Sequence, residues 1–269
     1  MSPFPESKHS LAKPVDAPRQ NQVFEGKVSV KAPNKLSNKT QAFTPSKEQD
    51  DIVKACATSN VMVSARPGSG KTTTIKAILQ DNPSTSMVVI TYSKRLQVDT
   101  LNKLMPYGFE EDDKVLLDLR QKNARPTWRS TVDLVVLDEV QDMNENLYWL
   151  TCAFLATVSR NQENPPRLLC LGDPNQAIYE FKGADSRYLQ LAEDAFKDVN
   201  PYPWEKLSLP KSFRLSHQTA AFVNTLITGT EKIEGSHDGP MPIYLHADLD
   251  DAESLLKKVR PLIEQYTPE

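Results

Sequence analysis

The stretch Val61-Met62-Val63-Ser64-Ala65-Arg66-Pro67-Gly68-Ser69-Gly70-Lys71-Thr72-Thr73-Thr74 decides the fold. An apolar run with β-branched residues leads into a Gly/Pro turn, and a Lys-Thr pair precedes a helix-compatible segment over 73–80. This order predicts a strand, a phosphate-binding loop and a helix. Backbone N–H groups of such a loop converge on a phosphate, and the helix N-terminus adds partial positive charge.

Each residue type in the loop has a chemical reason to be there. Gly68 and Gly70 let the backbone approach a phosphate, Lys71 can reach the β- and γ-phosphates, and the Thr72 hydroxyl can ligate Mg²⁺. The alternative is a glycine-rich turn without a ligand, and Ala65 stands where the usual pattern has its first glycine. The predicted nucleotide-binding residues of the loop are Ala65, Arg66, Pro67, Gly68, Ser69, Gly70, Lys71, Thr72 and Thr73.

Composition sets the broad class of the protein. A chain of 269 residues with 39% apolar content can form one large domain or two small ones. It has no apolar run of the roughly 18 residues that a membrane span needs, and no apolar segment typical of a secretory signal near the N-terminus. Cys56, Cys152 and Cys170 are scattered, which is typical of reduced, buried thiols. We therefore expect a nuclear or cytoplasmic protein without a membrane partner.

Charge is unevenly distributed. The chain carries a net charge of −3, although residues 1–42 contain seven Lys or Arg against three Asp or Glu. This segment is rich in Pro, Ser, Asn and Gln, so it is predicted to be a disordered basic tail. Its single basic residues favour a solvated tail, and contact with phosphates or a localisation signal is the alternative.

The ordered part is predicted to begin near Phe43. Ser46 or Thr44 can cap a helix that runs to about Ser59. Gln49 in this helix carries an amide whose donor and acceptor suit the edge of adenine. Its position before the phosphate-binding loop makes it a candidate nucleotide-binding residue.

Strands and helices are predicted to alternate after the loop. Apolar runs of this kind suit parallel strands covered on both faces by helices, which gives an α/β fold with a doubly wound sheet. Polar residues follow the strands, at the edge where such sheets bind ligands. Strands are predicted at 87–92, 131–137, 167–171 and 242–246, and helices at 93–104, 114–121, 144–160 and 252–265.

The pair Asp138-Glu139 ends an apolar strand. Beside a phosphate-binding loop, Asp138 can hold Mg²⁺ while Glu139 orients or deprotonates the attacking water. The alternative is a solvated acidic turn, and the apolar strand before the pair argues against it.

Five segments together resemble the UvrD-like family of superfamily 1 DNA helicases. Gln49 and the phosphate-binding loop are followed by Thr91-Tyr92, by Asp138-Glu139-Val140-Gln141-Asp142, and by Gly172-Asp173-Pro174-Asn175-Gln176-Ala177-Ile178-Tyr179-Glu180-Phe181-Lys182-Gly183-Ala184. The segment Pro210-Lys211-Ser212-Phe213-Arg214 also matches. The resemblance covers residues 43–228 and implies a RecA-like P-loop NTPase domain that uses ATP and Mg²⁺.

The resemblance also implies roles for individual residues. Lys71, Glu139, Gln176 and Arg214 would be catalytic, with Gln176 sensing the γ-phosphate and Arg214 acting as an arginine finger. Phe213 would stack on adenine, and Thr72 and Asp138 would bind the metal. The residues implied to contact single-stranded DNA are Thr91, Tyr92, Lys94, Tyr179 and Phe181, with core packing as the alternative for Phe181. Lys182 stands where the family usually has Arg.

Two parts of the family pattern are not found in this sequence. The 66 residues between Lys71 and Asp138 leave little room for the family's helical insertion, and residues 229–269 are expected to be a short extension rather than a second motor domain. We therefore expect an ATP-hydrolysing domain that does not unwind DNA alone, and a protein partner is a possible source of the second domain. The alternative is a catalytically inactive helicase relic that binds nucleic acid or protein.

Overall fold

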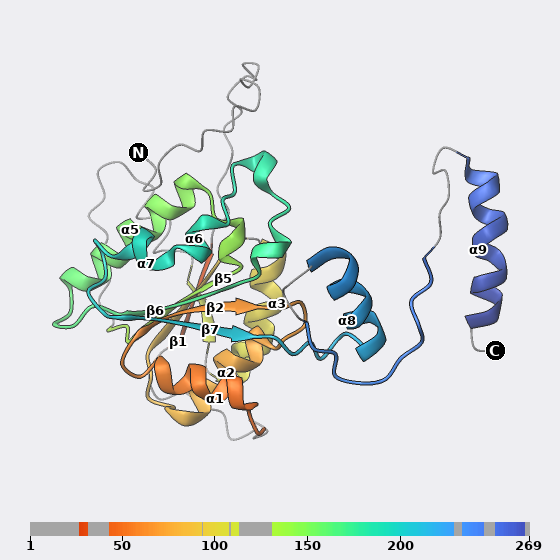
Figure 1. Cartoon of the computed structure of the whole chain (residues 1–269). Helices are drawn as coiled ribbons and strands as arrows, with labels where there is room; N and C mark the ends of the chain where they lie inside the picture. The colour runs from red at the N-terminus through yellow and green to blue at the C-terminus, as the bar shows by residue number, and fades with distance from the viewer. Residues whose placement is uncertain are drawn as a thin grey trace, which may run out of the picture. The chain divides into compact units, whose positions relative to one another are not determined.

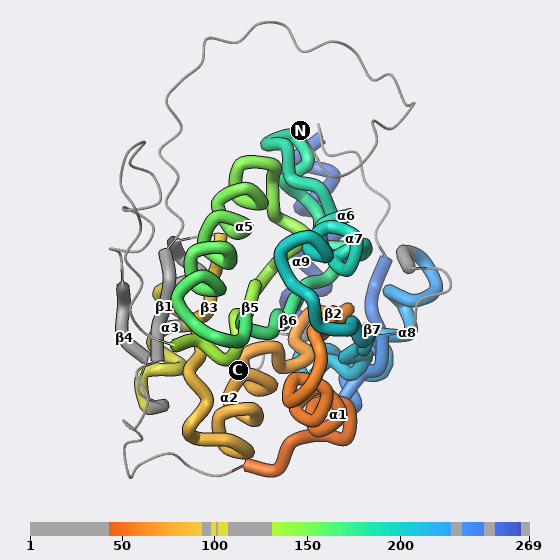
Figure 2. The backbone as a smooth tube through the Cα atoms, turned by 90° about the vertical axis from the view of Figure 1, so that its left-hand side faces the viewer, coloured from red at the N-terminus to blue at the C-terminus, as the bar shows by residue number. Residues whose placement is uncertain are grey.

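The computed structural model describes residues 27–31, 43–92, 94–107, 109–112, 131–228, 233–244 and 251–266. The chain forms two compact units, Met1–Arg214 and Leu215–Glu269, and each is described by itself. Figure 1 shows both units, and Figure 2 adds the labels of β3 and β4.

The first unit is built on a mixed sheet with the strand order β4-β1-β3-β5-β6-β2-β7. The strands β3, β5, β6, β2 and β7 pair in parallel, whereas β1 pairs antiparallel with both β3 and β4. Their bounds are β1 Lys27–Lys31, β2 Asn60–Ala65, β3 Met87–Thr91, β4 Phe109–Asp112, β5 Leu134–Asp138, β6 Arg167–Gly172 and β7 Trp204–Leu209.

Helices cover both faces of this sheet (Figures 1 and 2). One face carries α1 (Lys47–Ala55), α2 (Lys71–Asp81) and α3 (Lys94–Leu104), and the other carries α5 (Glu145–Arg160), α6 (Arg187–Gln190) and α7 (Ala192–Phe196).

Two buried clusters lie on the two faces because successive strand side chains point in opposite directions. Val135 and Leu137 join the cluster under α5, whereas Leu134 and Val136 join the cluster under α1 and α2. The predicted α/β fold is confirmed, and the predicted doubly wound parallel sheet is formed by the five strands β3, β5, β6, β2 and β7.

Local capping explains where the helices start. Ser46 caps α1: its Oγ accepts the Gln49 N–H at 3.3 Å, and Gln49 Oε1 accepts the Ser46 N–H at 3.0 Å. Asn144 caps α5 by accepting the Leu147 N–H at 3.0 Å. At the start of α2, Gly70 adopts φ 88° and no side chain caps the helix, so its first N–H groups stay available for a ligand.

Several expectations about the first unit need correction. The prediction of a disordered tail over 1–42 is wrong for Lys27–Lys31, which forms β1, and the rest of that range lies outside the described residues. The strand β4 was not expected either. The helix predicted at 114–121 lies outside the described residues.

The second unit begins earlier than the expected boundary at 228. It contains α8 (His217–Val223), a π-helical turn over Asn224–Thr228, and α9 (Ala252–Tyr266). Hydrogen bonds join its N-terminal part to residues 233–239: the His217 N–H donates to the His237 carbonyl at 2.8 Å, and the Ile233 N–H donates to Asn224 Oδ1 at 2.7 Å. A boundary at 228 would separate these partners. Residues 242–244, predicted as the start of a strand, have no regular secondary structure.

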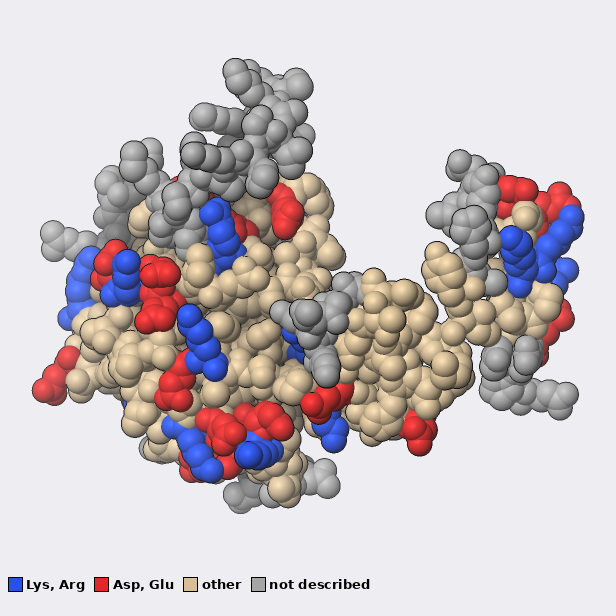
Figure 3. All heavy atoms as spheres, viewed as in Figure 1, with Lys and Arg blue, Asp and Glu red and all other residues tan. Residues whose placement is uncertain are grey.

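The three cysteines have the buried, unpaired state that the sequence predicts. Cys56, Cys152 and Cys170 are buried and free, and burial raises the pKa of the Cys56 thiol to about 12. Acidic and basic side chains are interspersed on the face seen in Figure 3. None of the helices in the described part of the chain combines the length and the apolar character that crossing a membrane requires.

Candidate active site

A cavity of about 410 Å³ surrounds the phosphate-binding loop at the carboxyl edge of the parallel strands. The loop turns through two glycines in the left-handed region, Gly68 at φ 71° and Gly70 at φ 88°. The predicted residues that line the cavity are Gly68, Ser69, Gly70, Lys71, Thr72, Thr73, Asp138, Glu139 and Arg214. The fold therefore brings together the ends of β2 and β5 and the segment after β7.

An ion pair crosses this cavity. Lys71 Nζ lies 3.0 Å from Glu139 Oε1, and the two side chains are only 15% and 20% exposed. Glu139 has φ 58° and is the one non-glycine residue with positive φ in the described part of the chain. Such strain costs free energy and is found where a side chain must be aimed. Gln141 Nε2 donates to Glu139 Oε2 at 2.9 Å and holds the other carboxylate oxygen.

Of the two aspartates near Glu139, Asp138 is buried and Asp142 is half-buried. Burial, reinforced by the Glu139 charge, raises the pKa of Asp138, and Lys71 opposes this effect. Burial together with Glu139 also raises the pKa of Asp142 to about 6. A cation in the cavity would relieve this concentration of negative charge.

Thr72 and Asp138 fit a magnesium ion chemically. Both line the cavity, and both offer hard oxygen donors of the kind that Mg²⁺ prefers. Asp138 is 3% exposed, so its carboxylate has little water to compensate its charge. A divalent cation bridged to phosphates is a suitable partner for this carboxylate.

A second hollow of about 540 Å³ shares Gly68 and Gly70 with the first, and Phe213 and Lys211 line it. The Phe213 ring is 52% exposed, and Lys211 Nζ lies 5.5 Å from its centroid. An exposed ring beside the phosphate-binding loop can stack on a base. The backbone is fixed here because the Phe213 N–H donates to the Gly68 carbonyl at 3.0 Å.

Gln49 lines the same hollow but is 3% exposed. Its Oε1 accepts from Ser46, and its Nε2 donates to the Gly70 carbonyl at 3.4 Å. The sequence predicts a free amide that faces adenine. In the structure, the oxygen and the nitrogen of the Gln49 amide both make hydrogen bonds within the protein. Gln49 links α1 to the phosphate-binding loop.

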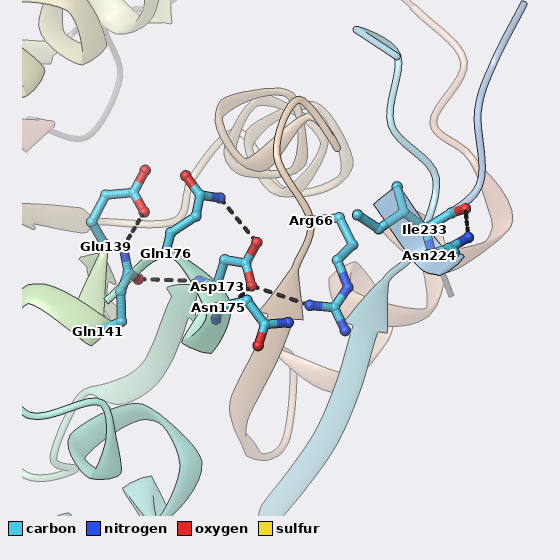
Figure 4. A network of polar contacts seen from close by, with 8 residues as sticks. All are labelled: Arg66, Glu139, Gln141, Asp173, Asn175, Gln176, Asn224 and Ile233. Carbon is cyan, nitrogen blue, oxygen red and sulfur yellow. Dashed lines mark hydrogen bonds and ion pairs between the residues drawn. The ribbon is translucent and has the colours of Figure 1, made fainter. Parts of the chain in front are cut away.

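Three predicted nucleotide-binding residues of the loop line neither of these two hollows. Ala65 is fully buried at the end of β2, and Pro67 accepts a hydrogen bond from Ser212 Oγ at 2.6 Å. Arg66 turns away and pairs with Asp173, with Nη1 3.1 Å from Oδ1. Figure 4 shows this pair and the polar contacts around it. Gln176 belongs to that network, because its Nε2 donates to Asp173 Oδ2 at 2.9 Å.

The predicted DNA-binding residues fall into two groups. Thr91 is 2% exposed, and the hydroxyl oxygens of Thr91 and Tyr92 are both buried, so these two side chains face the protein interior. Tyr179 and Phe181 are 38% and 78% exposed, and Lys182 Nζ lies 4.9 and 5.5 Å from their ring centroids. The exposure of Phe181 argues against core packing. The Lys94 side chain lies outside the described residues.

Sequence reasoning missed four residues of the cavity. Lys76 on α2 and Asp99, Thr100 and Lys103 on α3 line its wall. The spacing of Thr72 and Lys76, and of Asp99 and Lys103, places each pair on one helix face, which is a usable signal. That signal is weak because nothing in the sequence says which face of α3 meets the loop.

Comparisons with known proteins agree with the motifs. Residues 92–197 match the model of the UvrD/REP helicase N-terminal domain. Over these residues the chain is similar to that helicase domain, as the motifs led us to expect.

Two curated relatives are both described as a subunit of an ATP-dependent helicase/nuclease. The protein from Staphylococcus haemolyticus is 26% identical over 157 residues, which cover 56% of this chain and 12% of the relative. The protein from Bacillus cytotoxicus is 26% identical over 141 residues, which cover 51% of this chain and 11% of the relative. The match therefore spans about an eighth of the length of these proteins.

Solved structures with a similar backbone include Pif1 helicases. The Bacteroides Pif1 bound to single-stranded DNA is 18% identical, with a TM-score of 0.45, and the match covers 71% of this chain and 47% of that one. The Pif1 helicase from Candida albicans is 13% identical, with a TM-score of 0.41, and the match covers 85% of this chain and 56% of that one.

Proposed function

We propose that this chain binds and hydrolyses Mg-ATP, as the ATP-binding motor domain of a UvrD-like helicase that acts on single-stranded DNA. The observation that carries the proposal is the 3.0 Å contact of Lys71 with Glu139 in a cavity that Asp138 and Arg214 also line. A surface turn with the same residues would not gather these four side chains around one loop. The family match supports the same proposal.

The residues divide the work of hydrolysis as follows. Lys71 leaves Glu139 for the γ-phosphate, which frees the Glu139 carboxylate to orient and deprotonate a water molecule. Arg214 stabilises the negative charge that develops on the transferred group. Thr72 and Asp138 would hold Mg²⁺, which neutralises phosphate charge when it is bound. Phe213 stacks on the base of the nucleotide.

Tyr179 and Phe181 are the proposed stacking surface for bases of a single strand. Their ring centroids lie 6.1 Å apart, and Lys182 supplies a positive charge beside both rings. Base–aromatic stacking contributes about 1–3 kcal/mol per base. Because Thr91 is buried and the hydroxyl oxygens of Thr91 and Tyr92 are enclosed, we propose that DNA contacts there use mainly the backbone of these residues.

The test is steady-state Mg-ATP hydrolysis by the purified chain, with and without single-stranded DNA, beside Glu139→Gln. We expect turnover that DNA stimulates and that the variant lowers by about 100-fold or more, since it removes the proposed base. ATP binding should survive in Glu139→Gln and fall in Lys71→Ala.

Other outcomes decide between the alternatives. Tight ATP binding without turnover would mean that a further positive group must come from outside these 269 residues, for example from a protein partner. A chain that binds DNA or protein but no nucleotide, with the same behaviour in Lys71→Ala, would contradict the proposal and support a non-catalytic binding module.

A further inference from the structure

A buried ion pair joins the phosphate-binding loop to the segment that follows β6. Arg66 Nη1 lies 3.1 Å from Asp173 Oδ1, and the side chains are 9% and 2% exposed. Burying two charges costs free energy, so such a pair is weak evidence for stability and calls for another reason. Arg66 takes no part in lining the nucleotide cavity, so direct phosphate binding is not that reason.

The Asp173 carboxylate is the centre of a polar network (Figure 4). Besides Arg66, it accepts the Asn175 N–H on Oδ1 at 3.0 Å and the Gln176 amide on Oδ2 at 2.9 Å. The Asp173 N–H donates to Gln141 Oε1 at 3.1 Å. Arg66 and Gln176 are therefore the two side chains that share one buried carboxylate.

The network returns to the phosphate-binding loop. Gln141 bonds to Glu139 at 2.9 Å, and Glu139 pairs with Lys71 at 3.0 Å. The contacts thus run from Arg66 through Asp173, Gln141 and Glu139 to Lys71, five residues further along the same loop. The Arg66 carbonyl also accepts the Ser69 N–H at 3.0 Å. A displacement of the Arg66 backbone would therefore also displace the backbone of the loop.

We propose that Arg66 is a positioning residue that sets, through Asp173, the orientation of Gln176. This inference rests on the proposed function, in which Gln176 senses the γ-phosphate. Gln176 does not line the cavity around the phosphate-binding loop, so we infer that its amide leaves Asp173 to reach a phosphate there. The Arg66 guanidinium remains on the carboxylate when the amide leaves, so no buried anion loses its last side-chain partner. Without Arg66, Gln176 is held on Asp173 and its release costs more.

The experiment measures kcat and KM for ATP, and the affinities for ADP and for a β,γ-imido ATP analogue, in the full chain. The variants are Arg66→Met, Gln176→Ala, the double variant and the conservative Arg66→Lys. Arg187→Met is a matched control, because it removes a guanidinium that lies 2.6 Å from Asp185 outside the site.

We expect Arg66→Met to lower kcat about 10- to 100-fold, as misplacement of a reacting group does. ADP affinity should stay within about twofold, since ADP lacks the γ-phosphate that Gln176 reads. The double variant should be no slower than Gln176→Ala, because both changes remove one function. Arg66→Lys should recover part of the rate, and Arg187→Met should leave the rate unchanged.

Two results would overturn the inference. ADP affinity that falls as much as analogue affinity would show that Arg66 shapes the loop itself, and effects that multiply in the double variant would show that Arg66 and Gln176 act independently. If Arg66→Met does not fold, Arg66→Lys combined with Gln176→Ala gives the same comparison.

The same measurements distinguish failure of the proposed function from failure of the proposal about Arg66. A wild-type chain that binds no nucleotide removes both proposals, whereas turnover with independent Arg66 and Gln176 effects removes only this one. If the chain binds ATP without turnover, the test is the ratio of the affinity for the analogue to the affinity for ADP. We expect Arg66→Met to lower this ratio.

Discussion

At the scale of single residues, Gly68 and Gly183 share a backbone conformation but not their surroundings. Both have positive φ, 71° and 80°. A Cβ on Gly68 would lie 2.7 Å from Arg214 Cβ, whereas a Cβ on Gly183 would meet nothing within 4 Å. The two glycines therefore separate the cost of a left-handed backbone from the cost of a clash.

We predict that Gly183→Ala lowers the free energy of unfolding by about 1–2 kcal/mol, the cost of the left-handed conformation alone. Gly68→Ala should cost more and should weaken nucleotide binding, because it forces Arg214 away from the loop. Urea denaturation and titration with a fluorescent ADP measure the two effects. Equal losses of stability and of binding in both variants would contradict this account.

Site residues can be predicted from sequence where a short stretch of the chain contains the whole pattern. Lys71, Asp138 and Glu139 line one cavity, and they could be singled out from sequence because each belongs to a short local pattern. The ion pair of Arg66 could not be predicted, because its partner, Asp173, is 107 positions away and no local pattern links them. Buried polar networks of this kind are decided by tertiary packing.

At the scale of elements, α1 connects a helix cap to the phosphate-binding loop. Ser46 caps the helix together with Gln49, and Gln49 also bonds to the Gly70 carbonyl. We predict that Ser46→Ala lowers the free energy of unfolding by about 1 kcal/mol, the usual cost of losing a cap, and that it weakens ATP binding through Gln49.

The control for this prediction is Ser84→Ala, an exposed serine whose hydrogen bonds, among the residues that the structure describes, go to Asn82 in its own turn. Its effect on unfolding should be within about 0.5 kcal/mol. Unfolding curves in urea and ATP titrations of both variants provide the comparison. If the Ser46 variant loses stability but keeps full ATP affinity, the helix cap does not influence the phosphate-binding loop, and the prediction is wrong.

Elements were predictable where the apolar pattern was long. The strands at β2, β3, β5 and β6 and the helix α5 follow from continuous apolar runs or helical spacing. The strand β1, Lys-Val-Ser-Val-Lys, was missed because five residues with two valines do not stand out in a polar segment. Its pairing partners, β3 and β4, are far away in sequence.

At the scale of the molecule, the structure predicts where the chain can be cut. Every residue that lines the nucleotide cavity precedes Leu215, and hydrogen bonds tie residues 215–224 to residues 233–239. We predict that fragment 1–214 keeps a cooperative unfolding transition and ATP binding. Fragment 1–228, which ends at the boundary expected from sequence, should be less soluble because α8 loses its partners.

Size-exclusion chromatography and thermal unfolding of the two fragments, beside the full chain, measure this difference. If fragment 1–228 is more soluble and unfolds at a higher temperature than fragment 1–214, the boundary at 228 would be favoured.

The strand order has a consequence for synthesis on the ribosome. The strand that carries the phosphate-binding loop, β2, pairs only with β6 and β7 among the described strands, and these end at Gly172 and Leu209. A nascent chain therefore displays an apolar strand and a Lys-Thr loop for about a hundred residues of elongation before either neighbour emerges. At about 5–20 residues per second, that interval lasts about 5–20 s, during which β2 has no sheet neighbour among the described strands.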